Sequence, residues 1–248
     1  AHAYRLRISA PQPRFRAMVT PSAILATVGG HTPLRFLVDR QDGFTGPVEI
    51  ELVDAPKGWL LHGARIPSSR DQIRATLELP KLKPDQPVEL HFRAIAMRGE
   101  REVVSPVTPA DDRMQAFLWR HLVSTEQFLV MPRSRGRPPV MKLASDEAVR
   151  LVPGTTSDVR IMTSGANLPL AVRLVASEPP PGIVVEDFGL LADGFILKLR
   201  TEESAPAGLE GNLVIEGWMP PKAKPGKKAG RPYPVGALPA IPFIIATP

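Results

Sequence analysis

The chain of 248 residues contains 29 prolines, 19 glycines and no cysteine. A hydrophobic fraction of 43% is enough for packed cores and excludes a chain that is disordered throughout. The absence of cysteine excludes disulfides, thiolate metal ligands and cysteine nucleophiles. No apolar run approaches the roughly 18 residues that a membrane-spanning helix needs. Proline at this density breaks long helices and is typical of turns and strand edges, so the composition favours a β-rich fold.

The net charge of +6 is concentrated in two short stretches. Residues 132–137 (PRSRGR) carry three arginines, and residues 220–232 (PPKAKPGKKAGRP) carry five lysines and arginines, without an acid in either stretch. The other 23 basic residues are balanced by 25 acidic ones. We therefore expect nearly neutral domains with positively charged loops.

Alternation of apolar and polar residues with a period of two predicts one-sided antiparallel strands in the first half of the chain. In residues 87–97, for example, Val88, Leu90 and Phe92 alternate with polar side chains. Similar or shorter patterns predict strands at 14–20, 23–28, 33–39, 47–53, 72–79 and 101–107. About seven short strands separated by turn residues are typical of an immunoglobulin-like β-sandwich.

The second half of the chain repeats this plan. Alternating patterns predict strands at 156–163, 168–175, 194–200 and 212–218. The turn at Gly58 is matched by a turn at Gly182, an offset of 124 residues. A repeat of this length predicts two copies of one sandwich.

Residues 111–124 (DDRMQAFLWRHLVS) are the one stretch with helical spacing. Asp111 or Asp112 could cap a helix, and one face would carry Met114, Phe117, Leu118 and Leu122. We expect this helix to lie between the two repeats, followed by a closing strand at 128–130.

The sequence thus predicts an all-β fold of two tandem antiparallel immunoglobulin-like β-sandwiches with a short helical segment between them. The expected parts are a lead-in strand from a preceding domain at 1–13, a first sandwich at 14–131, a linker at 132–138 and a second sandwich at 139–248. The chain begins without a methionine or a leader peptide, so we expect a mature product or a fragment of a longer protein.

Three segments resemble a known family. They are residues 40–48 (RQDGFTGPV), residues 56–59 (PKGW), and the pair MQAF at 114–117 and RHLV at 120–123. They are similar to the tandem immunoglobulin-like modules that follow a pre-peptidase C-terminal-type domain in large exported proteins of planctomycete-type bacteria. The resemblance implies a non-catalytic structural or adhesive module and supplies no catalytic residues. The second repeat departs from the family pattern, because SGAN at 164–167 replaces the Asp-Gly-Phe turn.

Motifs for catalysis and for cofactor binding are missing from the sequence. It has no Gly-x-Ser-x-Gly elbow and no complete phosphate-binding loop. Adjacent carboxylates such as Asp111-Asp112 point to opposite faces of a strand, which does not suit a glycosidase pair. Asp39 and Asp42 offer too few oxygens for calcium, and we interpret Asp42-Gly43 as a turn. We therefore expect no enzyme activity and no cofactor.

The five histidines do not show the spacing of a zinc site. They lie about 30 residues apart and on different predicted elements, at His2, His31, His62, His91 and His121. Zinc requires three or four ligands brought close together. We therefore interpret each histidine as a surface or turn residue and expect no metal.

The three tryptophans lie on distant segments, whereas a sugar-binding platform needs coplanar aromatic rings. We expect Trp59 to plug the first sandwich and Trp119 to seal the helix onto a domain, while Trp218 ends a strand. An accessory carbohydrate-binding module attached to a secreted hydrolase therefore remains the alternative function rather than the leading one.

The loop at 219–238 is the most distinctive predicted surface. Prolines keep it extended, and its cations are a candidate contact for an acidic glycan or an acidic protein surface. These cations are Lys222, Lys224, Lys227, Lys228 and Arg231. Nucleic acid is not an expected partner, because no aromatic residues are interleaved with the charges.

The leading functional hypothesis is a non-catalytic spacer or adhesion module of a larger exported bacterial protein, at the cell surface, in the periplasm or secreted. Its partners would be other domains of the parent chain and acidic surfaces. A third hypothesis, a chaperone-like sandwich, would need an exposed edge strand to which a peptide could add.

Overall fold

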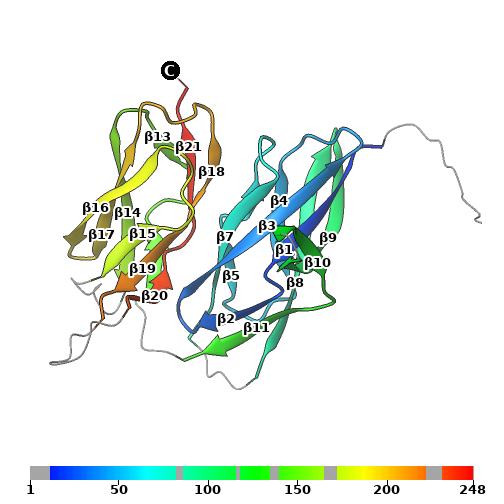
Figure 1. Cartoon of the computed structure of the whole chain (residues 1–248), viewed down its shortest axis with the longest axis horizontal. Coiled ribbons are helices and arrows are strands. Elements are labelled where there is room, and N and C mark those ends of the chain that lie inside the picture. Colours follow the sequence, from blue (N-terminus) through cyan, green and yellow to red (C-terminus); the bar gives the residue numbers. More distant parts are fainter. Residues whose placement is uncertain are drawn as a thin grey trace, which may run out of the picture.

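The computed structural model describes residues 12–81, 86–115, 118–134, 140–164, 172–221 and 231–247. These residues form an all-β structure without an α-helix, in which strands lie in two groups, β1–β11 and β12–β21 (Figure 1). The arrangement is consistent with β-sandwich architecture. No helix among these residues has the length and apolar character needed to cross a bilayer.

The first group contains β1 (Arg14–Thr20), β2 (Ala23–Thr27), β3 (His31–Gln41), β4 (Val48–Val53), β5 (Leu60–His62), β6 (Arg65–Ile66), β7 (Gln72–Glu78), β8 (Val88–Arg98), β9 (Arg101–Met114), β10 (Arg120–Ser124) and β11 (Phe128–Arg133). The second contains β12 (Val140–Leu143), β13 (Val149–Leu151), β14 (Thr156–Ser164), β15 (Arg173–Ala176), β16 (Ile183–Leu191), β17 (Gly194–Thr201), β18 (Glu210–Leu213), β19 (Ile215–Met219), β20 (Tyr233–Ala237) and β21 (Ile241–Ile245).

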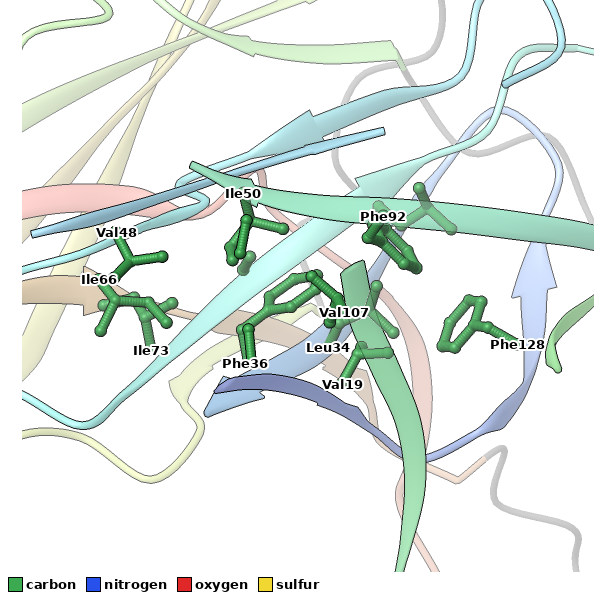
Figure 2. Packing of buried hydrophobic residues seen from close by; sticks show 14 of the residues in the cluster. Val19, Leu34, Phe36, Val48, Ile50, Ile66, Ile73, Phe92, Val107 and Phe128 are labelled. Carbon is green, nitrogen blue, oxygen red and sulfur yellow. The ribbon is translucent and has the colours of Figure 1, made fainter. Parts of the chain in front are cut away.

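In the first group, β3 pairs antiparallel with β1 on one side and with β7 on the other, and β7 pairs with β5. A second set of strands runs β4–β8–β9, and β8 also pairs with β11. Phe36, Phe92 and Phe128 interlock between these layers, with ring centroids 5.3 Å and 5.1 Å apart in edge-to-face contact (Figure 2). Alternation in the strands thus produces one continuous core.

The second group has its own hydrophobic cluster. The sheet β12–β14–β17–β16 contributes Ile161, Phe195 and Leu197, and the sheet β13–β21–β18 contributes Phe243. The strands β15, β19 and β20 pair in that order. A separate cluster means that each group buries the apolar faces of its own strands.

The predicted helix at 111–124 is wrong, because residues 110–114 and 120–124 pair as two antiparallel strands. The strand β9 continues through Met114, and β10 pairs with it antiparallel from Arg120↔Met114 to Ser124↔Ala110. The Asp112 carboxylate and the Arg120 guanidinium, 2.7 Å apart, link the two strands. Helical spacing alone was misleading, because no core faces the apolar stripe: the Leu118 side chain is 81% exposed. Phe117 lies outside the described residues.

The alternating patterns predicted strands correctly wherever the structure describes them, from β1 to β4 and at β7, β8, β9, β11, β14, β17 and the β18–β19 region. β11 extends through Pro132 and Arg133, which the sequence assigned to the linker. The lead-in strand falls mostly on residues 1–11 and the linker residues 135–138 lie outside the described residues.

Candidate functional site at the contact between the strand groups

The strand β7 presents two different faces. Ile73, Ala75 and Leu77 are buried in the core of the first group. The alternate residues Thr76 and Glu78 point away from this core, because successive side chains of a strand lie on opposite sides of a sheet. In the second group, β18 contacts β7, and β20 pairs with the start of β3 as a neighbouring strand of the same sheet.

Hydrogen bonds to backbone groups join the two strand groups. The Thr76 hydroxyl accepts the Ala240 backbone N–H at 2.8 Å, in a fully buried position. The Asn212 side-chain amide donates to the carbonyl oxygens of Gly63 and of Arg74. The backbone of His31 in β3 pairs with Ala237 in β20. Each of these contacts involves a backbone group, which moves less than the end of a side chain. They therefore restrain the position of one strand group relative to the other.

Charged side chains surround these hydrogen bonds. The Arg74 guanidinium donates to the Ser177 carbonyl oxygen at 2.6 Å and lies 4.0 Å from both Glu178 and Glu216. Arg35 forms an ion pair with Glu178. Burial lowers the pKa of Arg74 from its usual value, and the two glutamates oppose this effect. The contact is therefore polar and matched in charge.

Two histidines and a glutamate form a cluster on the same face. His31 pairs directly with Glu78 in the β3–β7 register, while His62 pairs with Thr76 in the β5–β7 register, two residues away on β7. Thr76 and Glu78 lie on the same face of β7 because they are two residues apart, so the side chains of His31, His62 and Glu78 come together on this face. His62 Nε2 lies 2.7 Å from Glu78 Oε2, and His31 Nε2 lies 3.5 Å from the same oxygen. The two imidazole centroids are 5.4 Å apart.

His31 is the unusual member of this cluster. The residue is only 4% exposed, and neither of its ring nitrogens has a well-formed hydrogen bond to the residues that the structure describes, since the nearest carboxylate oxygen, of Glu78, lies 3.5 Å from Nε2. A neutral imidazole carries one N–H donor, and a buried donor left without a partner costs about 1–3 kcal/mol. Buried polar groups of proteins normally have hydrogen-bond partners, so the buried His31 imidazole is a candidate for binding a ligand.

The surroundings of His31 and Glu78 shift the pKa values of both side chains. Burial lowers the pKa of His31 below its ordinary value of 6.5, although the Glu78 carboxylate opposes the shift. The neighbouring imidazoles, His31 first, lower the pKa of Glu78 to about 2, against the opposing effect of burial. Near neutral pH, the cluster thus holds a carboxylate and a neutral His31. A neutral imidazole and a carboxylate can each donate an electron pair to a cation.

A groove of about 500 Å³ lies next to the contact, between the β9–β10 hairpin, β3 and Glu178. Three arginines line it, and each has an acidic partner: Arg35 and Arg74 face Glu178, and Arg120 faces Asp112. Because the charges are compensated, the groove does not have the character of an anion site.

The predicted contact residues of the basic loop are not brought together by anything the structure describes. Lys222, Lys224, Lys227 and Lys228 lie outside the described residues, and Arg231 is exposed just before β20. The basic-loop contact therefore stays a prediction.

Predictions for individual aromatic and acidic residues had mixed outcomes. Trp59 is buried in the first core, as predicted, but Trp119 is 73% exposed on the hairpin and seals nothing among the described residues. Asp42 and Gly43 both have positive φ, which confirms the turn, and Phe44 closes over Phe15 at 5.1 Å. The Asp42 carboxylate faces Arg14 at 3.4 Å.

Sequence reasoning missed the histidine cluster. The interpretation of His31 as a surface or turn residue is wrong, since the residue is buried and lies beside His62. Spacing along the chain carried no signal, because strand register rather than sequence distance brings the three side chains together. The sequence offered one sign of the cluster: His31 begins the strand β3, and Glu78 ends the strand β7 that pairs with it.

Comparisons with known proteins leave the family open. No protein-family model and no curated protein matches the chain. Among solved structures, a chimeric titin Z1Z2-Z1Z2 tandem functionalized with a GRGDS peptide from fibronectin matches with 10% identity and a TM-score of 0.23, over 95% of this chain and 100% of that chain. A TM-score this low carries no argument about function. The resemblance to exported planctomycete-type modules gains no support from these comparisons.

Proposed function

We propose that the chain is a non-catalytic spacer or adhesion module of a larger exported multidomain protein, built from two immunoglobulin-like β-sandwiches in series. The first would span residues 14–131 and the second residues 139–248, joined by a linker at 132–138. Cell surface, periplasm and extracellular medium are all compatible with this role.

Strand pairing supports two copies of one plan. The order β3–β7–β5 in the first group corresponds to β14–β17–β16 in the second. In both, a turn precedes the last strand of this set: the Trp59 N–H donates to the Pro56 carbonyl oxygen, and the Ile183 N–H donates to that of Pro180. Gly58 and Gly182 occupy the left-handed position of these turns, with φ of 86° and 79°.

The observation that carries the spacer role is the contact between the two groups. The hydrogen bonds from the Asn212 amide to backbone carbonyl oxygens and from the Ala240 N–H to the Thr76 hydroxyl restrain both translation and rotation of one group against the other. A spacer that keeps its two ends at a set distance needs a fixed angle between its modules. Modules that rotate freely would not keep that angle. A stiff pair also presents its ends at a constant separation.

Backbone ¹⁵N relaxation on the full chain tests this role. We expect both strand groups to tumble with one common rotational correlation time. Asn212→Ala should separate the two correlation times, while Arg93→Ala, which removes only the exposed ion pair with Glu51, should not. Two independent correlation times in the unaltered chain would contradict the stiff spacer.

The acidic partner belongs to this proposal. Replacement of Lys222, Lys224, Lys227, Lys228 and Arg231 by serine should reduce retention on an acidic polysaccharide column. A matched control removes five exposed cations elsewhere, at Arg98, Arg101, Lys142, Lys198 and Arg200. Equal loss in both variants would assign retention to net charge, and unchanged retention would remove the loop as a contact. Binding should weaken with salt, as the screening length falls from about 10 Å at 0.1 M to about 3 Å at 1 M.

The alternative carbohydrate-binding role has less support. Trp59 is buried in the core, Trp119 is exposed next to β10, and Trp218 belongs to β19 of the other strand group. A glycan array separates this role from the spacer role, because a binding module would select defined neutral oligosaccharides. Hydrolysis of a sugar polymer or peptide by the purified chain would contradict the non-catalytic proposal.

A further inference from the structure

We propose that His31, His62 and Glu78 bind a divalent transition-metal cation of the zinc type, at the contact between the two strand groups. Each side chain offers one ligand atom, and the three atoms all lie within 4.8 Å of one another. The site goes beyond the spacer role, which requires no metal.

The distances suit a single ion. Ligand atoms about 2.1 Å from zinc in a tetrahedral arrangement lie about 3.4 Å from each other. His31 Nε2 already lies 3.5 Å from Glu78 Oε2. His62 Nε2 is closer, at 2.7 Å, because it shares a hydrogen bond with this carboxylate. A small rotation of the carboxylate, or of the half-exposed His62 ring, would open the space for the ion.

The ligands stand on regular strands rather than on loops. β3, β7 and β5 each contribute one ligand, and their pairing fixes the register of His31 opposite Glu78. Sites carried by paired strands hold their geometry before the ligand arrives. Nε2 of the buried His31 ring, which makes no hydrogen bond to the described residues, would donate its lone pair to the metal.

The donor set favours one class of metal. Imidazole nitrogens suit zinc, copper, nickel and iron, whereas magnesium and calcium require oxygen ligands. Three protein ligands leave a fourth position for water, reached past the His62 side chain, which is 30% exposed. Nδ1 of His31 lacks the acceptor that commonly orients a zinc-bound histidine, so we expect moderate affinity.

The location gives the metal a structural consequence. His31 pairs with Ala237 of β20, so one ligand residue would itself belong to the contact with the second group. A ligand that binds only the folded state raises the free energy of unfolding by RT ln(1 + c/Kd), where c is the free ligand concentration, so the gain grows with the logarithm of that concentration. Metal binding would thus stiffen the contact between the two groups.

Zn²⁺ titration of the full chain, freed of metal with a chelator, tests the proposal by calorimetry and by thermal unfolding. We expect one ion per chain and a higher Tm with Zn²⁺, and no effect of Mg²⁺. His62→Ala and Glu78→Gln should each lower the affinity by about 100-fold, since loss of an outer-shell partner alone costs 10- to 100-fold. Co²⁺ should give the absorption bands of a low-coordinate site.

His91→Ala is the matched control. His91 Nε2 also lies 3.4 Å from a glutamate, Glu89, but on an exposed surface with two groups only. A second control, His2→Ala, removes the histidine nearest the chain start. Both should bind Zn²⁺ like the unaltered chain. The proposal is overturned if the chain binds no Zn²⁺, if His62→Ala binds as tightly as the unaltered chain, or if His91→Ala or His2→Ala loses the site.

His31 needs a separate readout, because a buried variant could fail to fold. Histidine side-chain NMR on the unaltered chain follows each ring directly. The Nε2 resonances of His31 and His62 should shift on addition of Zn²⁺, while those of His91 and His121 stay in place. Shifts confined to the exposed histidines would equally overturn the assignment.

Discussion

The side-chain amide of Asn212 donates to the Arg74 carbonyl oxygen at 2.8 Å and, with its second N–H, to the Gly63 carbonyl oxygen. One amide nitrogen from β18 thus satisfies two backbone acceptors of the first strand group, separated from it by 138 and 149 residues in sequence. Both of its donors are used, so no water is needed to complete the contact. Asn212 is thus one of the residues that hold the two groups in a fixed orientation.

Gly63→Ala should disrupt this contact more than an equally strained glycine replacement elsewhere. Gly63 has φ of 70°, and a Cβ there would overlap Asn212 Nδ2 and lie 2.9 Å from Ala240 Cβ. Gly99 has φ of 62° with nothing within 4 Å of its Cβ position. Both variants incur the cost of a left-handed residue, about 1–3 kcal/mol, but only Gly63→Ala should shift the amide resonances of β18. Equal denaturation midpoints and unshifted β18 resonances would contradict the expectation.

Thr76→Val should destabilise the chain, although the side chain keeps its size. The Thr76 hydroxyl accepts the buried Ala240 N–H, which would lose this partner in the valine variant. A buried donor without a partner costs about 1–3 kcal/mol. Thr201 is the matched control, since it is 1% exposed and its hydroxyl makes no hydrogen bond to the part of the chain that the structure describes. Urea unfolding should therefore show a loss for Thr76→Val and no loss, or a small gain, for Thr201→Val.

Asp111→Asn should reduce stability near neutral pH and lose its effect in acid. Asp111 Oδ1 accepts the backbone N–H of Ser22 at 3.1 Å and its hydroxyl at 2.8 Å. The Ser22 backbone bond is the main cause that lowers the pKa of Asp111 below its ordinary value of 3.8. A lowered carboxyl pKa stabilises the fold above the ordinary value, and this contribution disappears as the pH falls through the folded value.

Unfolding of the unaltered chain and of Asp111→Asn, compared between pH 7 and pH 3, measures this contribution. Asp112→Asn is the control, because the Asp112–Arg120 pair is exposed and screened by salt. In 1 M NaCl the Asp112 effect should vanish while the Asp111 effect persists. A stability difference for Asp111→Asn that is the same at both pH values would contradict the prediction.

Strands that bury one face were predictable from sequence, and strands at the margins were not. β7 and β8 alternate over seven residues or more because one side faces the core. β21 (IPFII) carries a proline and little polar alternation, so its pattern did not identify it. A helix was predicted at 111–124 from the spacing of its apolar residues alone, but Met114 and Leu118 are exposed and contribute to no core.

Contacts between distant strands could not be predicted. His31, His62 and Glu78 meet because His31 pairs with Glu78 and His62 pairs two residues away on the same strand. A shift of one residue in either register would turn a ligand to the opposite face. Sequence patterns identify which face of a strand is polar, but register depends on turns and packing across the whole sheet.

The hairpin tip provides the last prediction. Leu118 and Trp119 are 81% and 73% exposed, and Leu118 has φ of 68°, a left-handed conformation that favours glycine. Had this segment been a packed helix, Trp119→Ser would remove a large buried surface. On an exposed hairpin, we expect it to change the free energy of unfolding by no more than about 0.5 kcal/mol. Leu118→Gly should be neutral or stabilising, because it relieves the backbone strain.

Phe128→Ala is the contrasting variant within the same strand group. Phe128 is 1% exposed and packs edge-to-face on Phe92, so its truncation should cost about 3–5 kcal/mol. Urea unfolding followed by far-UV circular dichroism reports all three variants on one scale. If Trp119→Ser proves as damaging as Phe128→Ala, the tryptophan is buried in solution and the hairpin tip folds back onto the molecule. If Trp119→Ser and Phe128→Ala both change the free energy of unfolding only slightly, Phe36, Phe92 and Phe128 do not pack into a tight core.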